Sequence, residues 1–161
     1  MRTIVIRPIQ KKDNIQIAAV IRQILIDMNV PKVGTAYADP QLDCMFETYS
    51  KPRTIYYVIE TQDLIIGGAG IGQLENEAVT ICELQKMYFL PEARGLGLGH
   101  QMIQKCLQSA RDFSYQKCYL ETMPYMEAAQ QLYKKVGFEY ICAPMGNTRH
   151  DSCPVWMLKD L

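Results

Sequence analysis

A glycine-rich turn between a strand-like segment and a helical one is the feature that most constrains this chain. Residues 83–90 mix apolar, aromatic and polar side chains as strands do, and Pro91 ends the strand because proline cannot donate a ladder hydrogen bond. Gly95, Gly97 and Gly99 follow, and then apolar residues recur at helical spacing over 102–110. The start of a helix presents unpaired N–H groups and a partial positive charge. The turn is therefore a predicted site for a phosphate or pyrophosphate group.

The spacing of these glycines excludes two nucleotide-binding motifs. A dinucleotide fingerprint needs a third glycine three residues after the second, where this chain has His100 or Met102, depending on which pair is counted. A P-loop needs Lys followed by Ser or Thr after its last glycine, where this chain has His-Gln. The remaining pattern is Arg-x-x-Gly-x-Gly, formed by Arg94, Gly97 and Gly99.

This pattern resembles the motif with which the GNAT superfamily of acyl-CoA-dependent N-acyltransferases holds the pyrophosphate of coenzyme A. Residues 132–138 read Leu-Tyr-Lys-Lys-Val-Gly-Phe and are similar to a second signature of that family, Leu-Tyr-x-x-x-Gly-Phe. The clear match covers about residues 56–140. It implies one α/β domain over residues 1–161, with a mixed, mostly antiparallel sheet of about seven strands, a splayed parallel central pair and about four flanking helices.

The periodicity along the chain is compatible with that fold. Strands are expected at 3–7, 54–60, 64–73, 78–89, 117–122, 138–142 and 155–158, and helices after Asp13, over 39–49, after the glycine turn and over 126–136. The strand, helix, strand order around the turn implies a parallel pair. Four glycines in 64–73 indicate that something passes close to that strand, either a ligand or, as the favoured explanation, a neighbouring helix.

Composition argues against several classes of partner. The chain has 17 basic and 17 acidic residues, so it lacks the net charge that attracts nucleic acid or anionic membranes. It contains no apolar run long enough to span a membrane and no signal-peptide pattern at its start. Its six cysteines lack Cys-x-x-Cys pairs, which favours free thiols over disulfides or zinc ligands. We therefore expect a cytoplasmic protein without nucleic-acid, membrane or metal partners, and a homodimer stays an open alternative.

The resemblance implies where acetyl-CoA, the expected cosubstrate, would bind. In the family the pantetheine arm pairs with the first of two splayed strands, which here corresponds to Met87, Tyr88 and Phe89. A backbone N–H there, expected to be that of Met87, would face the thioester oxygen. Arg94 would anchor the turn and could also pair with phosphate directly. The pyrophosphate would be bound by the backbone amides of Gly95, Leu96, Gly97, Leu98, Gly99 and His100.

Three side chains are candidates for acid–base chemistry. Tyr133 matches the family's usual general acid, which protonates the departing thiolate, although a tyrosine on an apolar helix face can also be an ordinary core residue. Alkyl ammonium groups have a pKa near about 10.4, so a base helps at neutral pH. Glu83 and Glu121 are the candidates, because each lies in a strand beside the point where the pair parts. Either one could instead be a hydrogen-bonded structural carboxylate.

The acceptor side is less defined. Tyr37, Asp39 and Phe46 could contact the acceptor, although packing or surface roles are favoured, and His150 could line the pocket from the loop 144–154. One position departs from the family pattern: many relatives carry a cofactor-contacting asparagine seven residues before the tyrosine, whereas this chain has Met126.

These features predict an N-acetyltransferase that moves an acetyl group from acetyl-CoA to a primary amine of a small molecule, amino acid or peptide by direct attack. A noncatalytic acyl-CoA-binding sensor is the alternative from another class, and transfer of a longer acyl group is a third hypothesis. The joint presence of Tyr133, Glu83 and Glu121 favours the enzyme.

Overall fold

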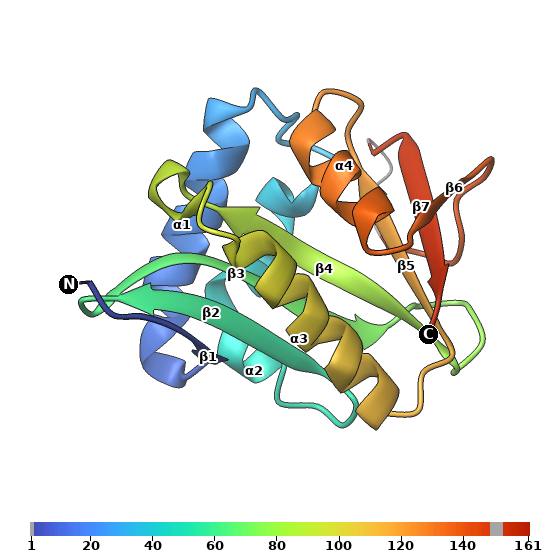
Figure 1. The fold of residues 1–161 in the computed structure, drawn as a ribbon, viewed down its shortest axis with the longest axis horizontal. Coiled ribbons are helices and arrows are strands. Elements are labelled where there is room, and N and C mark those ends of the chain that lie inside the picture. The colour runs from blue at the N-terminus through green and yellow to red at the C-terminus, as the bar shows by residue number, and fades with distance from the viewer. Residues whose placement is uncertain (1, 149–152) are drawn as a thin grey trace.

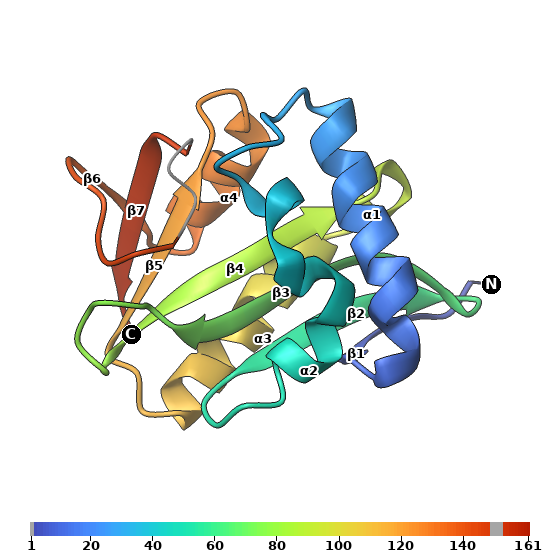
Figure 2. The same ribbon diagram turned by 180° about the vertical axis from the view of Figure 1, so that it is seen from behind.

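In the computed structural model, described for residues 2–148 and 153–161, seven strands of the described chain form one mixed sheet between two layers of helices (Figure 1). The helices α1 (Asn14–Asp27) and α2 (Met45–Thr48) cover one face, and α3 (Leu98–Asp112) and α4 (Glu127–Lys135) cover the other (Figure 2). The order across the sheet is β1-β2-β3-β4-β5-β7-β6. The strands are β1 (Ile4–Pro8), β2 (Ile55–Thr61), β3 (Leu64–Gln73), β4 (Ile81–Phe89), β5 (Lys117–Thr122), β6 (Glu139–Ile141) and β7 (Val155–Asp160).

The central strands β4 and β5 are parallel, while the other described pairs are antiparallel. The pairing of β4 with β5 extends only over Ile81↔Lys117, Cys82↔Cys118 and Glu83↔Tyr119. Beyond that point the two strands diverge, as Figure 1 shows. The expected splayed parallel pair is confirmed.

The segment expected to be a helix over 39–49 is less regular than predicted. It consists of a 3₁₀ helix, Pro40–Cys44, followed by the single turn of α2. Asp39 caps the 3₁₀ helix, since its Oδ1 accepts a hydrogen bond from the Gln41 N–H at 2.9 Å. Among the described residues, three further 3₁₀ turns lie at Lys11–Asp13, Ala36–Ala38 and Pro91–Ala93.

The glycines of β3 accommodate aromatic rings of the neighbouring strands. A Cβ at Gly68 or Gly70 would lie 2.5 or 2.6 Å from the ring of Tyr56 on β2. A Cβ at Gly67 would lie 2.5 Å from the ring of Phe89 on β4. At Gly67 and Gly68 the close neighbours are thus atoms of adjacent strands and not of the helix that we favoured from the sequence, whereas Gly70 also faces the ring of Tyr49 at the end of α2.

Each helix layer covers its own apolar core. The apolar residues expected at helical spacing over 102–110 lie on α3 and are buried against the sheet. On the opposite face, α1 packs with the 39–49 segment over Tyr56. All six cysteines are free, as expected, and Cys82, Cys106 and Cys118 are buried. No helix within 2–148 and 153–161 is long and apolar enough to cross a membrane.

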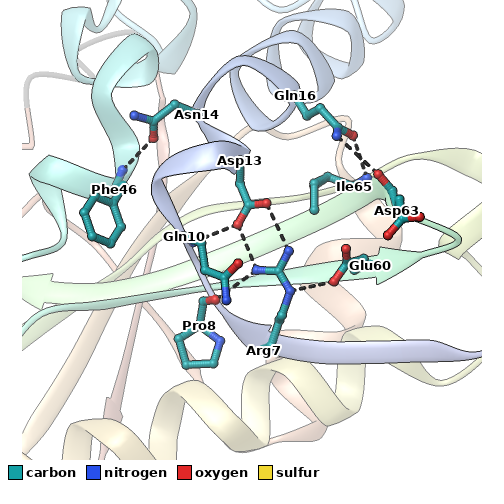
Figure 3. Close-up of polar contacts among 10 residues, drawn as sticks. All are labelled: Arg7, Pro8, Gln10, Asp13, Asn14, Gln16, Phe46, Glu60, Asp63 and Ile65. Carbon is teal, nitrogen blue, oxygen red and sulfur yellow. Dashed lines mark hydrogen bonds and ion pairs between the residues drawn. The ribbon is translucent and has the colours of Figure 1, made fainter.

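A buried ion pair ties β1 to the start of α1 (Figure 3). Asp13 is 2% exposed and accepts hydrogen bonds from Arg7 Nη1 at 2.8 Å, from Arg7 Nη2 at 3.0 Å and from the Gln10 N–H at 2.7 Å. Arg7 Nε donates to Glu60 of β2 at 2.6 Å. Burial by itself would raise the pKa of Asp13, but Arg7 and the Gln10 amide hold this pKa below its ordinary value.

The first turn of α1 is bonded to two more distant segments. Asn14 Oδ1 accepts from the Phe46 N–H at 2.8 Å, which joins α1 to α2 (Figure 3). Gln16 Oε1 accepts from the Ile65 N–H at 2.9 Å, which joins α1 to β3. These bonds fix the helix layer that lies over the glycine-containing face of β3.

Asp13→Ala should lower the free energy of unfolding by about 3 kcal/mol, because it leaves a largely buried guanidinium with only one of its two carboxylate partners. Asp43→Ala is the matched control, since it breaks the exposed Arg22–Asp43 pair and should cost much less. Urea unfolding followed by the fluorescence of Trp156, the one tryptophan, measures both changes. Equal losses in the two variants would contradict the role given to the buried pair.

Candidate active site

Two cavities meet where β4 and β5 part. The groove, with a volume of about 510 Å³, follows the glycine turn and the end of β4. The inner cavity, of about 60 Å³, lies deeper between the parted strands and contains Glu83 and Glu121 in its wall. Ligands in the two cavities would meet beside the residues common to both walls, which are Met87, Tyr88, Met126, Ala129 and Tyr133.

The glycine turn has left-handed backbone at two positions. Gly95 has φ of 74° and Gly97, the N-cap of α3, has φ of 73°. No atom lies within 4 Å of the Cβ that either could carry, so glycine is favoured at these positions by the left-handed φ and not by lack of space. Gly99 has a different role, because a Cβ there would lie 2.9 Å from Leu132 of α4 and 3.3 Å from Phe89. The turn therefore seats α3 closely against α4 and β4.

The wall of the groove contains backbone N–H groups that could bind an anion. Leu98, Gly99 and His100 line it, and the N–H groups in the first turn of a helix have no acceptor within that helix. Arg94 also lines the groove, and its Nη2 donates to the Phe89 carbonyl at 3.2 Å, which anchors the turn to the end of β4. Leu96 is 53% exposed and lies outside this wall, unlike the other residues predicted for the cofactor.

A bulge in β4 lies beside the junction of the cavities. Lys86 and Met87 together stand opposite Ala69 of β3, and Lys86 has φ of 49°. The buried Tyr56 hydroxyl donates to the Lys86 carbonyl at 2.8 Å. Because the carbonyl and the following N–H of a trans peptide point in opposite directions, this bond turns the Met87 N–H away from Tyr56. The direction of one backbone donor at the junction is thereby fixed.

Glu83 is a buried carboxylate with one oxygen bonded. It is 6% exposed, and its Oε1 accepts from Gln85 Nε2 at 2.7 Å. Within residues 2–148 and 153–161, no hydrogen bond reaches its Oε2. Burial raises the pKa of Glu83 to about 7, although the hydrogen bond from Gln85 lowers it. This carboxyl group can therefore gain or lose a proton near neutral pH.

Glu121 on β5 has both carboxylate oxygens occupied. Its Oε2 accepts from the Tyr119 hydroxyl at 2.6 Å, and its Oε1 accepts from the hydroxyl of Thr148. Burial raises the pKa of Glu121, and the two hydrogen bonds lower it. The bonding of both oxygens distinguishes Glu121 from Glu83.

Tyr133 of α4 lies at the junction of the two cavities. It is 6% exposed, and its ring packs edge-on against Phe138 with the centroids 6.0 Å apart. Burial raises the pKa of its hydroxyl, so the phenol is protonated at neutral pH. Since the described residues make no hydrogen bond to this hydroxyl, its proton is available to a ligand.

Comparison with known proteins decides the family. Residues 20–138 match the model of the Acetyltransferase (GNAT) family. The chain is also 40% identical over 158 residues to the uncharacterized N-acetyltransferase YjgM of Escherichia coli K12, an alignment that covers 98% of this chain and 95% of that protein. The chain belongs to the GNAT acetyltransferase family.

Solved GNAT structures share the whole fold. The GNAT-family acetyltransferase from Staphylococcus aureus Mu50 superposes with a TM-score of 0.87 at 20% identity, covering 99% of both chains. The yncA protein of Salmonella typhimurium, solved with its cofactor acetyl-CoA, superposes with a TM-score of 0.78 at 18% identity, covering 99% of this chain and 94% of that one. The expected fold class is confirmed.

In this GNAT chain the residues predicted for catalysis converge, whereas those suggested for the acceptor do not. Tyr37, Asp39 and Phe46 lie outside the walls of both cavities, and His150 lies outside the described residues. Asp39 instead binds Lys86 Nζ at 3.2 Å.

Several wall residues were missed by the sequence reasoning. Val30, Thr35 and Ala36 line the inner cavity from the segment after α1, and Lys86 lines it from the bulge. No sequence pattern marks these positions. Met126, where many GNAT relatives carry asparagine, is common to both walls, and its Sδ accepts from the Thr122 hydroxyl at 3.4 Å. No group of three or more His, Cys, Asp or Glu placed to hold a metal ion occurs among the described residues.

Glu83 should make folding depend on pH. Its pKa is raised from 4.5 to about 7 in the folded chain, so its stabilising contribution is full below about pH 4.5 and is lost as the pH rises through about 7. Glu83→Gln stays neutral, so its free energy of unfolding relative to wild type should increase by about 2–3 kcal/mol between pH 5 and pH 8.

Urea unfolding at the two pH values measures this difference. The matched control is Glu139→Gln, which changes an exposed side chain of β6 and should leave the pH dependence as in wild type. If the free energies of unfolding of Glu83→Gln and wild type changed equally between pH 5 and pH 8, the pKa of Glu83 would not be raised in the folded chain.

Proposed function

We propose that this chain is an acetyl-CoA-dependent N-acetyltransferase that acetylates a primary amine of a small molecule, amino acid or peptide by direct attack. The observation that carries the proposal is the shared wall of the two cavities. Tyr133 and Met87 lie in that wall, with the glycine turn along the groove and Glu83 in the inner cavity. The groove also falls in the size range of small-molecule sites, roughly 300–1,000 Å³.

The groove suits the two chemically distinct parts of the cosubstrate. Its anion site, formed by the first amides of α3 with Arg94, would take the pyrophosphate. Because β5 leaves β4 after Glu83, the edge of β4 from Met87 to Phe89 is free to pair with the amide groups of the pantetheine arm. The solved structure of yncA with acetyl-CoA supports this cosubstrate.

In the proposed reaction a bond forms between the acceptor nitrogen and the acetyl carbon, and the bond from that carbon to sulfur breaks. Negative charge develops on the acetyl oxygen, and the Met87 N–H would donate to it. Its direction is fixed in advance, since Tyr56 holds the Lys86 carbonyl of the same peptide group. A preorganised donor of this kind is worth about 10²–10³ in rate.

Three proton transfers complete the reaction. Glu83 would accept the proton of the acceptor ammonium, because it lines the inner cavity and its pKa of about 7 is near neutral pH. Glu121 would assist through its charge only, since both of its oxygens are bonded. Tyr133 would give its hydroxyl proton to the departing thiolate, and the second proton that the nitrogen loses as the amide forms would restore the Tyr133 hydroxyl.

The noncatalytic sensor remains the competing function. A sensor needs the groove but has no use for a second cavity with an open carboxylate oxygen. Glu83 in the wall of the inner cavity therefore favours the enzyme over the sensor.

Acetyl-CoA and a panel of primary amines should give turnover when free thiol is followed with a thiol reagent. The panel should contain small amines, amino acids and short peptides. Saturable binding of acetyl-CoA without thiol release for any acceptor would favour the sensor, and absence of binding would overturn the proposed cosubstrate.

Tyr133→Phe should lower kcat by at least about tenfold, because it removes the proton donor for the thiolate, and should leave the dissociation constant of acetyl-CoA nearly unchanged. Tyr140→Phe is the matched control, because this exposed tyrosine of β6 lies outside both cavities and should keep full activity. Unchanged kcat in Tyr133→Phe would refute its role as the acid.

A further inference from the structure

The side chain of Gln85 connects Glu83 to the helix layer above the sheet. Gln85 follows Glu83 by two residues on β4, so both side chains point to the same face. Its Nε2 donates to Glu83 Oε1 at 2.7 Å, and its Oε1 accepts from the Tyr49 hydroxyl at 2.6 Å. Tyr49 is the residue that ends α2. A continuous line of hydrogen bonds thus runs from α2 to the carboxylate.

The chemistry of its two ends fixes the direction of this line. Burial raises the pKa of Tyr49 well above its ordinary value, so its hydroxyl keeps a proton to donate. An ionised carboxylate can only accept. The amide of Gln85 satisfies both neighbours when its oxygen faces Tyr49 and its nitrogen faces Glu83. In this orientation Gln85 favours the ionised form of Glu83, which is the form that can accept a proton.

Two glycines of β3 leave the space that the line occupies. Gly72 is the register partner of Glu83, and a Cβ there would lie 3.2 Å from Gln85 Oε1. A Cβ at Gly70 would lie 3.0 Å from the ring of Tyr49. Both glycines therefore accommodate side chains of the line, and Gln85 itself lines the inner cavity next to Glu83.

We propose that Gln85 is a positioning residue: it holds Oε1 of Glu83 so that Oε2 stays directed at the inner cavity, and Tyr49 holds Gln85 in turn. This inference rests on the proposed function, because it takes Glu83 as the base that receives the acceptor's proton.

Other charged and titratable groups surround Glu83 but do not replace this bond. The negative charges of Glu121 and Glu75 raise the pKa of Glu83, and the positive charge of Lys86 lowers it. In the described chain, the hydrogen bond to its side chain comes from Gln85 alone. The groups that interact electrostatically with Glu83 are Glu121, Tyr119 and Cys118 of β5, Lys86 and Tyr88 of β4, Glu75 after β3, and Tyr49.

The test compares the pH dependence of kcat/KM in wild type, Gln85→Met and Tyr49→Phe. Methionine keeps the length of glutamine without its donor, so the acid limb of the profile should move up by about 0.5–1 pH unit in Gln85→Met. Tyr49→Phe should move it in the same direction by less. Gln108→Met on the exposed face of α3 is the matched control and should leave the limb in place. A uniform loss of rate with an unmoved acid limb would overturn the inference.

A second readout does not need turnover. The stability difference between wild type and Glu83→Gln should level off near pH 7, and in the Gln85→Met background it should level off at higher pH. If it levels off at the same pH, the inference fails, and it fails independently of activity. If Gln85→Met does not fold, both measurements, the acid limb of kcat/KM and the pH dependence of stability, are made with Tyr49→Phe. This variant removes only one hydroxyl and should fold.

Failure of the inference and failure of the proposed function give different results. If Glu83→Gln keeps full kcat/KM and the acid limb, Glu83 is not the base and the proposed function loses its proton acceptor. If Glu83→Gln loses activity while Gln85→Met behaves as wild type, the base assignment stands and only the positioning role is overturned.

Discussion

The early end of pairing between β4 and β5 is the constraint on which the rest of the structure depends. The two strands separate after Glu83↔Tyr119, although both continue toward the same edge of the sheet. Their separation leaves one edge of β4 free, opens the inner cavity and lets α4 bring Tyr133 beside Met87. Glu83 occupies the last paired position, so the sheet still holds its backbone while its side chain lies at the base of the opening.

Side chains on the face of the sheet covered by α1 and α2 hold the polar groups of this opening in fixed positions. Tyr56 holds the carbonyl of the bulge, and Gln85 holds one oxygen of Glu83. Both depend on the glycines of β3, which leave no side chains where the two polar contacts lie. A carboxylate buried in this way makes the folded chain less stable at high pH, and the same burial brings its pKa near 7. The stability lost and the basicity gained therefore have one physical cause.

Local spacing and the order of elements were enough to predict the glycine turn, the helix after it and the parallel pair, whereas the convergence of Tyr133 with both glutamates was implied by the resemblance to the family. The first three features depend on neighbours in sequence or on the order of elements. The difference between Glu83 and Glu121 was not predictable, because it comes from contacts such as Tyr49–Gln85 and Thr148–Glu121 that join distant segments. The bulge at Lys86 and the 3₁₀ helix before α2 were missed for the same reason, since tertiary contacts override local propensity there.

Acetyl-CoA, as the proposed cosubstrate, should span the groove from the start of α3 to the bulge of β4. Adding acetyl-CoA to ¹⁵N-labelled protein and following the backbone amide resonances tests this most directly. The amides of Leu98, Gly99 and His100 should shift together with that of Met87, while those of β1, which is far from both cavities, should stay in place. Shifts at the start of α3 without any change at Met87 would contradict the claim.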